Sequence, residues 1–121
     1  MTETILNNTH ETIIDAIRDR KGHAISIVDL SNIPGASAST FVIAEGSSNT
    51  QVAAIADRIE ERLLKDLALK PFNTDGFKNS EWIVLDYGDT WIHIFLHDAH
   101  LRYNLEGLWS DAPITEIPDL D

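Results

Sequence analysis

Three histidines in the C-terminal third of the chain, His93, His97 and His100, are of a type and at a spacing that could hold a metal ion. Imidazole nitrogens bind zinc at about 2 Å. On one strand His93 and His97 would lie about 13 Å apart, because a strand rises about 3.3 Å per residue, so one ion could not reach both. His97 and His100 could meet in a turn, but two ligands alone make a weak site. We therefore expect no metal site here.

A second place for chemistry is the Gly46-Ser47 pair, which follows a predicted strand and precedes a predicted helix. Backbone N–H groups at such a turn can bind a phosphate, and a Gly-Ser turn in a mixed sheet also resembles the nucleotidyltransferase fold. Those enzymes hold magnesium with paired carboxylates on a neighbouring strand. The nearest acidic pairs lie along a helix or around a turn instead: Asp57 with Glu60, and Asp86 with Asp89. A simple helix cap is the plainer interpretation, and a metal-dependent nucleotidyltransferase that uses Ser47 stays open as an alternative.

Motifs of other enzyme classes are missing from the sequence. There is no G-x-S-x-G nucleophile elbow, no P-loop and no dinucleotide-binding glycine motif. Cysteine is also absent, which excludes disulfides, thiol catalysis and thiolate metal sites. The residues therefore indicate no catalytic set and no cofactor.

The composition limits where the chain works and what it binds. Its 121 residues are the size of one domain, and 43% of them are hydrophobic, which is enough for a core. A net charge of −11 disfavours direct binding to DNA or bare RNA and favours a basic protein partner. No apolar run is long enough to span a membrane, and the N-terminus lacks the features of a signal peptide. We expect a cytoplasmic protein.

The elements that must position these residues follow from hydrophobic periodicity. A helix is predicted over 8–21, with Asn8 as its cap and Gly22 as its end. Buried strands are predicted over 24–30 and 40–46, and a weaker one over 70–75. Ser48 and Gln51 predict a capping box that opens a second helix. The core-facing stripe of that helix has helical spacing: Val52, Ala56, Ile59, Leu63 and Leu67.

The stretch from 80 to 95 is predicted to be a β-hairpin with a two-residue turn at Gly88-Asp89. This register pairs Trp82 with Phe95, and it pairs Asp86 with Trp91. Both faces of the hairpin are apolar along much of their length, so its sheet should be covered on both sides. Because Trp82 opens one strand and Tyr87 sits at the hairpin tip, each could serve either as an interface anchor or as ordinary packing.

The remaining C-terminal sequence completes the predicted architecture. A short helical turn is predicted over 101–109, and residues 114–121 are expected to form an acidic, flexible tail. The sequence thus predicts a single α/β domain over 1–113, with a mixed β-sheet of about five strands and packed helices.

The hairpin and the segments around it resemble one known family, the ribosomal silencing factors, also called RsfS or Iojap. The resemblance covers residues 10 to 113 and rests on Trp82-Ile83-Val84-Leu85-Asp86-Tyr87-Gly88-Asp89, Ile92-His93-Ile94-Phe95, Arg102-Tyr103-Asn104-Leu105-Glu106, Leu108-Trp109-Ser110-Asp111-Ala112-Pro113, Phe41-Val42-Ile43-Ala44 and Gly46-Ser47-Ser48. The chain departs from the family pattern at Ser39-Thr40, Glu45 and Asn104.

The resemblance implies a fold related to nucleotidyltransferases without their active site, and a function that is not enzymatic. It implies binding to the large ribosomal subunit through its basic protein numbered fourteen, which blocks joining of the small subunit and represses translation when nutrients are short. Carried onto this chain, the expected contact residues are Trp82 and Tyr87, with Asp86 and Asp89 as electrostatic partners. A generic acidic adaptor for another basic protein stays open, as does a homodimer of the free protein.

Overall fold

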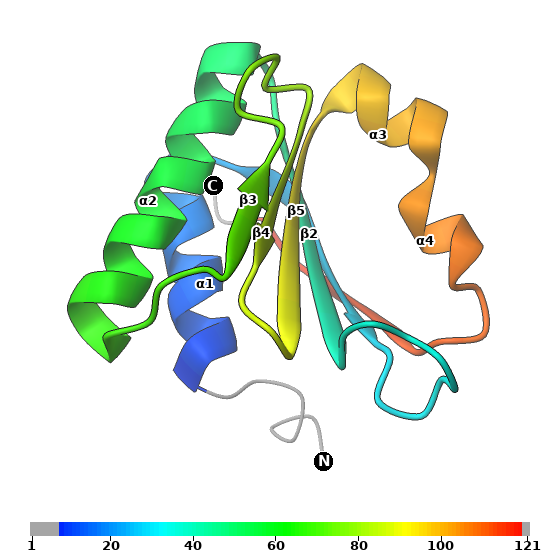
Figure 1. Ribbon diagram of the computed structural model, residues 1–121. Helices are drawn as coiled ribbons and strands as arrows, with labels where there is room; N and C mark the ends of the chain where they lie inside the picture. The colour runs from blue at the N-terminus through cyan, green and yellow to red at the C-terminus, as the bar shows by residue number, and fades with distance from the viewer. Residues whose placement is uncertain (1–7, 120–121) are drawn as a thin grey trace.

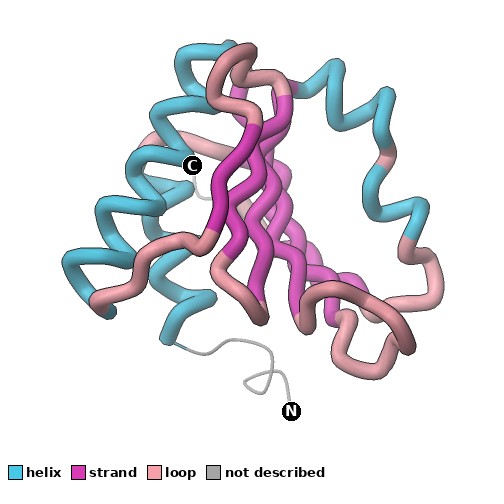
Figure 2. Tube along the Cα trace, viewed as in Figure 1, coloured by secondary structure: helices cyan, strands magenta, loops and turns pink. Residues whose placement is uncertain are grey.

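The computed structural model describes residues 8–119 as one sheet between two layers of helices (Figure 1). Helices α1 and α2 cover one face of the sheet, and α3 and α4 lie on the other, as the strand layer of Figure 2 makes clear. The elements run in the order α1 (Asn8–Asp19), β1 (His23–Asp29), β2 (Thr40–Gly46), α2 (Asn49–Leu67), β3 (Asn73–Asp75), β4 (Trp82–Asp86), β5 (Thr90–Leu96), α3 (His97–Tyr103), α4 (Leu105–Leu108) and β6 (Ile114–Ile117).

The sheet is mixed, as predicted, with the strand order β3-β4-β5-β2-β1-β6. Its central pair, β2 and β5, is parallel, and the other neighbouring pairs are antiparallel. A parallel pair at the centre must be covered on both faces, and the two helical layers provide that cover. The predicted α/β fold class is confirmed, and the sheet has six strands, compared with the expected number of about five.

The larger core lies between the sheet and α1 with α2. Helix α2 buries Val52, Ala56, Ile59 and Leu63 of the predicted stripe, with Leu67 partly buried at its end. Ser48 caps the helix, and its hydroxyl accepts a hydrogen bond from the Gln51 N–H at 3.1 Å. The Gln51 side chain reaches back to the N–H of Ser47 and not to that of Ser48, so the capping box is shifted by one residue.

At the end of α1, the residue that takes the left-handed backbone conformation differs from the predicted one. The residue with left-handed backbone is Lys21, with φ of 59°, and Gly22 is not left-handed. Gly22 is required for a different reason: a Cβ there would lie 2.5 Å from the Ile17 side chain. The glycine allows the chain to turn closely against the helix before β1 begins.

Residues 114–117 were expected to belong to a flexible tail, and this expectation was wrong. They form β6, which pairs with β1 along Ile25 to Val28. The Asp29 N–H also donates to the Pro113 carbonyl at 2.9 Å. The edge of β1 was open after β2 had paired with its other side, so the backbone groups of the acidic C-terminal segment complete the ladder.

The segment after β5 also differs from the single turn predicted over 101–109. β5 ends at Leu96, and α3 starts at once at His97. Asn104, with φ of 45°, separates α3 from α4. No helix among residues 8–119 is both long and apolar enough to cross a membrane.

Gly76 and Gly35 allow a direct test of close packing in the loops. Both have positive φ, at 97° and 82°, but a Cβ at Gly76 would collide with the Trp82 carbonyl oxygen, whereas a Cβ at Gly35 meets nothing within 4 Å. Gly35→Ala should cost about 1 kcal/mol of unfolding free energy, the usual cost of left-handed backbone. Gly76→Ala should cost about 3 kcal/mol or more, because the backbone must also move. Urea unfolding of the two variants measures the difference, and equal losses would contradict this packing.

Candidate functional site

The β4–β5 hairpin forms with the predicted register, in which Trp82 lies opposite Phe95 and Asp86 opposite Trp91. Gly88 has φ of 85°, as a turn of this kind requires. The Gly88 N–H donates to the Asp86 carboxylate at 2.8 Å. This bond fixes the tip, because a short polar side chain satisfies a turn N–H that has no strand partner.

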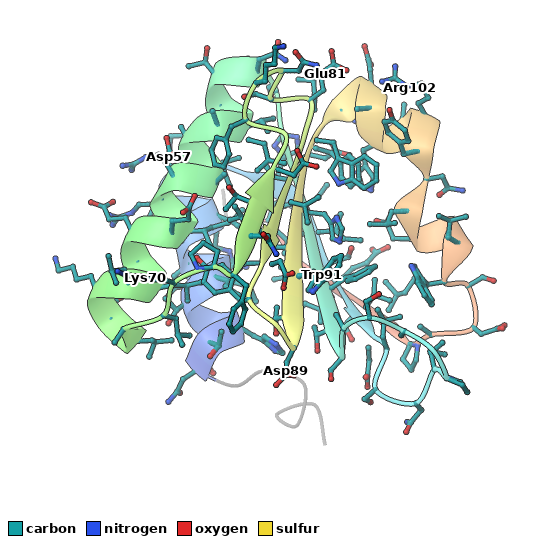
Figure 3. All side chains as sticks on the ribbon, in the orientation of Figure 1. Asp57, Lys70, Glu81, Asp89, Trp91 and Arg102 are labelled. Carbon is teal, nitrogen blue, oxygen red and sulfur yellow. The ribbon has the colours of Figure 1, made fainter. Side chains whose placement is uncertain are left out.

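The structure does not bring Trp82 and Tyr87 together. Trp82 packs on the side of the sheet that carries α3 and α4, and Tyr87 packs against the core on the α1 and α2 side. Tyr87 also lies five positions after Trp82 along the hairpin, which is roughly 16 Å of strand. Asp86 shares the side of Trp82, whereas the exposed Asp89 lies at the tip itself (Figure 3). A single partner can therefore contact both Trp82 and Tyr87 only if it extends around the tip of the hairpin.

Trp82 is half-buried and held by three other rings. Its ring stacks on Phe95 with centroids 5.0 Å apart, and Tyr103 of α3 lies 4.8 Å away on a tilted plane. The indole Nε1 donates to Nδ1 of His93 at 3.1 Å. A partly exposed indole whose N–H is already bonded is a rigid apolar surface, as an interface anchor requires.

Trp82 belongs to a larger group of rings, which we call the aromatic face. Phe41 lies at its centre, 4.5 Å from His93, 5.9 Å from Trp109 and 6.3 Å from Trp91. The full group is Phe41, Trp82, Trp91, His93, Phe95, Tyr103 and Trp109.

The tryptophans of this face are only half-buried, and Tyr103 is exposed. Trp91 is one of these half-buried tryptophans. Figure 3 shows it on β5, on the side of the sheet that faces α3 and α4. The signal that could have found its exposure is its pairing with the polar Asp86.

Tyr87 is half-buried and packs against the larger core, so it is less accessible than an exposed interface anchor would be. Its hydroxyl is buried and has no hydrogen-bond partner among the described residues. Burial, together with the nearby charge of Glu60, raises the pKa of Tyr87 well above its usual range. Beside it at the tip, Phe72 is 75% exposed and lies against Gly88. The tip thus offers an exposed phenyl ring and the carboxylate of Asp89, and Tyr87 packs beneath them.

The three histidines do not converge on one point. His93 contacts Trp82, whereas His97 and His100 both contact the carboxylate of Glu45, with ring nitrogens 2.9 and 2.5 Å from its oxygens. Within residues 8–119 no group of three or more His, Cys, Asp or Glu side chains has the arrangement of a metal site. The cluster around Glu45 consists of hydrogen-bonded contacts between histidine rings and carboxylates.

The Gly46-Ser47 turn uses its polar groups within the helix cap. The Ser47 N–H donates to Gln51 Oε1, and the Ser48 hydroxyl accepts from the Gln51 N–H. Asp57 is the only acidic side chain among the residues that line the neighbouring hollow. Among the described residues that line this hollow, Asp57 therefore has no second carboxylate with which to form the pair that a metal-dependent nucleotidyltransferase needs.

The sequence of the chain is similar to that of known proteins along nearly its whole length. A family model described as "Ribosomal silencing factor during starvation" matches residues 3–121. The chain belongs to the ribosomal silencing factor family. It is 31% identical to the Ribosomal silencing factor RsfS of Halalkalibacterium halodurans over 104 residues, which cover 86% of this chain and 87% of that protein. It is 33% identical to RsfS of Bacillus subtilis over 102 residues, covering 84% of this chain and 85% of the relative.

Solved structures with sequences similar to this chain share its fold. A crystal structure of a Chromobacterium violaceum protein superposes with a TM-score of 0.78 at 29% identity, covering 84% of this chain and 83% of that one. A crystal structure from Bacillus halodurans gives a TM-score of 0.74 at 27% identity, covering 88% and 95% of the two chains. The architecture of a sheet between two helical layers is therefore shared by solved proteins.

His93 provides a pH test of the aromatic face. Burial lowers the pKa of His93 from 6.5 to about 4, so the unfolded chain takes up a proton before the folded one does. Stability should fall as the pH drops from 6.5 toward 4, by about 2 kcal/mol between pH 6.5 and pH 5. His93→Asn keeps an acceptor for the Trp82 N–H but cannot titrate, so it should remove this loss. Urea unfolding at pH 6.5 and pH 5 measures this loss of unfolding free energy. If the wild type and the variant lose the same amount, His93 is excluded as the cause.

Proposed function

We propose that this chain is a ribosomal silencing factor that binds the large ribosomal subunit through its basic protein numbered fourteen. By occupying that surface it blocks joining of the small subunit and represses translation when nutrients are short. It acts in the cytoplasm by steric exclusion and not as an enzyme. The observation that carries the proposal is membership of the ribosomal silencing factor family along nearly the whole chain.

The charge of the chain supports a protein contact over an RNA contact. A net charge of −11 repels the phosphates of ribosomal RNA. The same charge attracts a basic protein and speeds its association. On a particle made largely of RNA, an acidic factor is therefore directed toward the basic proteins that the RNA leaves exposed.

The surface that we propose for the contact runs along β4, from Trp82 at its start to the tip of the β4–β5 hairpin. Trp82 and Asp86 present one side of β4, and Asp89 is exposed at the tip above the half-buried Tyr87. An apolar ring surface bordered by carboxylates is the composition of a small interface with an anchor and a polar rim. The rigid packing of Trp82 on Phe95 lowers the ordering cost of binding.

The proposal predicts co-sedimentation of the purified protein with isolated large subunits. Added before the small subunits, the protein should reduce the yield of joined ribosomes in a sucrose gradient, because the two compete for one face. Added after joining, it should have less effect. If the protein stays in the supernatant, the proposed function fails; recovery of another basic protein from lysate would then favour the adaptor alternative.

A charge reversal at the tip tests the proposed surface. Asp89→Lys should weaken binding to the large subunit about tenfold, or about 1.4 kcal/mol, by setting a cation against a basic partner. Asp57→Lys is the matched control: Asp57 is exposed on α2, on the other side of the sheet (Figure 3), and this variant makes the same change in net charge. Affinity is measured by sedimentation at fixed salt. Equal weakening in both variants would show an effect of net charge alone and would exclude the tip as the contact.

A further inference from the structure

A cluster of ionisable side chains beneath α3 and α4 has no part in the proposed contact. His100 of α3 lies between two carboxylates. Its Nδ1 is 2.5 Å from Glu45 Oε2, and its Nε2 is 2.8 and 2.9 Å from the two oxygens of Glu106. Glu45 comes from β2 and is buried, with only 6% of its surface exposed. One imidazole thus joins the central sheet to α4.

The surroundings of this cluster are also polar. His97 of α3 is 2.9 Å from Glu45 Oε1, and His23 of β1 is 3.6 Å from the same oxygen. The hydroxyl of Ser26, also on β1, donates to Glu106 at 3.4 Å. From the C-terminal segment, two more carboxylates line the hollow that borders His100 and Glu106, those of Glu116 and Asp119.

Phe95 fixes the plane of the imidazole. Its ring stacks on His100 with centroids 4.8 Å apart and an angle of 8° between the planes. The imidazole therefore cannot turn away from one carboxylate without losing this stack. Both of its nitrogens stay directed at carboxylate oxygens.

The protonation state of the His100 imidazole decides whether its contacts with both Glu45 and Glu106 are favourable. Imidazolium donates from both nitrogens, whereas neutral imidazole donates from one and accepts at the other. A carboxylate can only accept. When His100 is neutral, one of its nitrogens therefore presents a lone pair to a carboxylate oxygen, and the two carboxylates lose the cation that lies between them.

We propose that Glu45, His100 and Glu106 form a pH-sensitive latch that fastens α3 and α4 to the sheet when His100 is protonated. The latch regulates the aromatic face and in this respect rests on the proposed function. Tyr103 at the end of α3 packs on Trp82, and Trp109 after α4 packs on Phe41. Opening the latch loosens the two short helices that support these rings.

The direction of the pKa shifts agrees with the geometry. Burial lowers the pKa of His100, but the hydrogen bonds and charges of Glu106 and Glu45 outweigh it, so the pKa lies above its usual 6.5. Burial raises the pKa of Glu45, but His97 and His100 outweigh it, so that pKa lies below its usual 4.5.

These directions set the pH window of the latch. The stability that His100 adds is complete below pH 6.5 and is lost as the pH rises through its raised pKa. The stability that Glu45 adds is complete above pH 4.5 and is lost on further acidification. The latch is therefore closed between these limits and opens on the alkaline side.

A nuclear magnetic resonance titration of the full chain tests the latch directly. In the wild type, the His100 ring should titrate above 6.5 and carry protons on both nitrogens at pH 6. Glu106→Gln should lower that pKa, because it removes one of the two negative charges. His97→Gln is the control: it removes a contact of Glu45 but leaves both carboxylates beside His100 in place, so the His100 pKa should stay above 6.5. Titration of wild-type His100 at or below 6.5 would overturn the proposal.

Thermal unfolding gives a second measurement, which does not depend on the fold of the Glu106 variant. The wild-type midpoint should fall by about 3 °C between pH 6.5 and pH 8 as the latch opens. His100→Gln should lower the midpoint at pH 6.5 and remove most of this fall, whereas His97→Gln should keep it. An unchanged fall in His100→Gln would exclude His100 as the cause.

Binding at the same two pH values separates the latch from the proposed function. If the latch supports the aromatic face, wild-type affinity for large subunits should be weaker at pH 8 than at pH 6.5, and His100→Gln should bind equally at both. If the wild-type affinity for large subunits is the same at pH 6.5 and pH 8, the proposed regulation of the aromatic face by the latch is overturned. Wild-type protein that binds at neither pH overturns the proposed function, whereas the titration and unfolding measurements still decide whether the latch exists.

Discussion

The pairing of β5 with β4 on one side and β2 on the other is the constraint on which the rest of the structure depends. In this register Ile92 and Ile94 enter the core under α1 and α2, while His93 and Phe95 enter the core under α3 and α4. Side chains alternate along a strand, so a slip of one residue would exchange the two sets. The turn at Gly88 prevents that slip.

The two cores that result are built differently. The one under α1 and α2 is aliphatic and is closed by a 19-residue helix, and Asp19 of α1 bonds Arg58 and Arg62 of α2 at 2.9 Å. The other is aromatic and is covered by helices of seven and four residues. Short helices cannot cover a whole sheet face, so rings of large area remain at the surface. The protein thus has a closed side, covered by long helices, and a more open side on which aromatic rings remain partly exposed.

On the side of the sheet that carries α3 and α4, two histidines have opposite pKa shifts because their surroundings differ. His93 is surrounded by rings and is neutral, because burial without a charged partner lowers its pKa. His100 lies seven residues later and keeps its proton more firmly than a free histidine, because two carboxylates outweigh the burial. Trp82 bonds the first of these histidines, and Phe95 stacks on the second. The aromatic face therefore contains the first histidine and packs against the second.

The sequence by itself determined the α/β class, the two long helices, the hairpin register and the family, because each depends on local periodicity, turn chemistry or a linear motif. It also singled out Trp82 and the hairpin tip. Only the tertiary structure decided what depends on residues distant in the sequence. Strand β6 exists because β1 left an open edge that the C-terminal segment could pair with. Glu45 meets His100 across 55 positions, a contact that no spacing rule could predict.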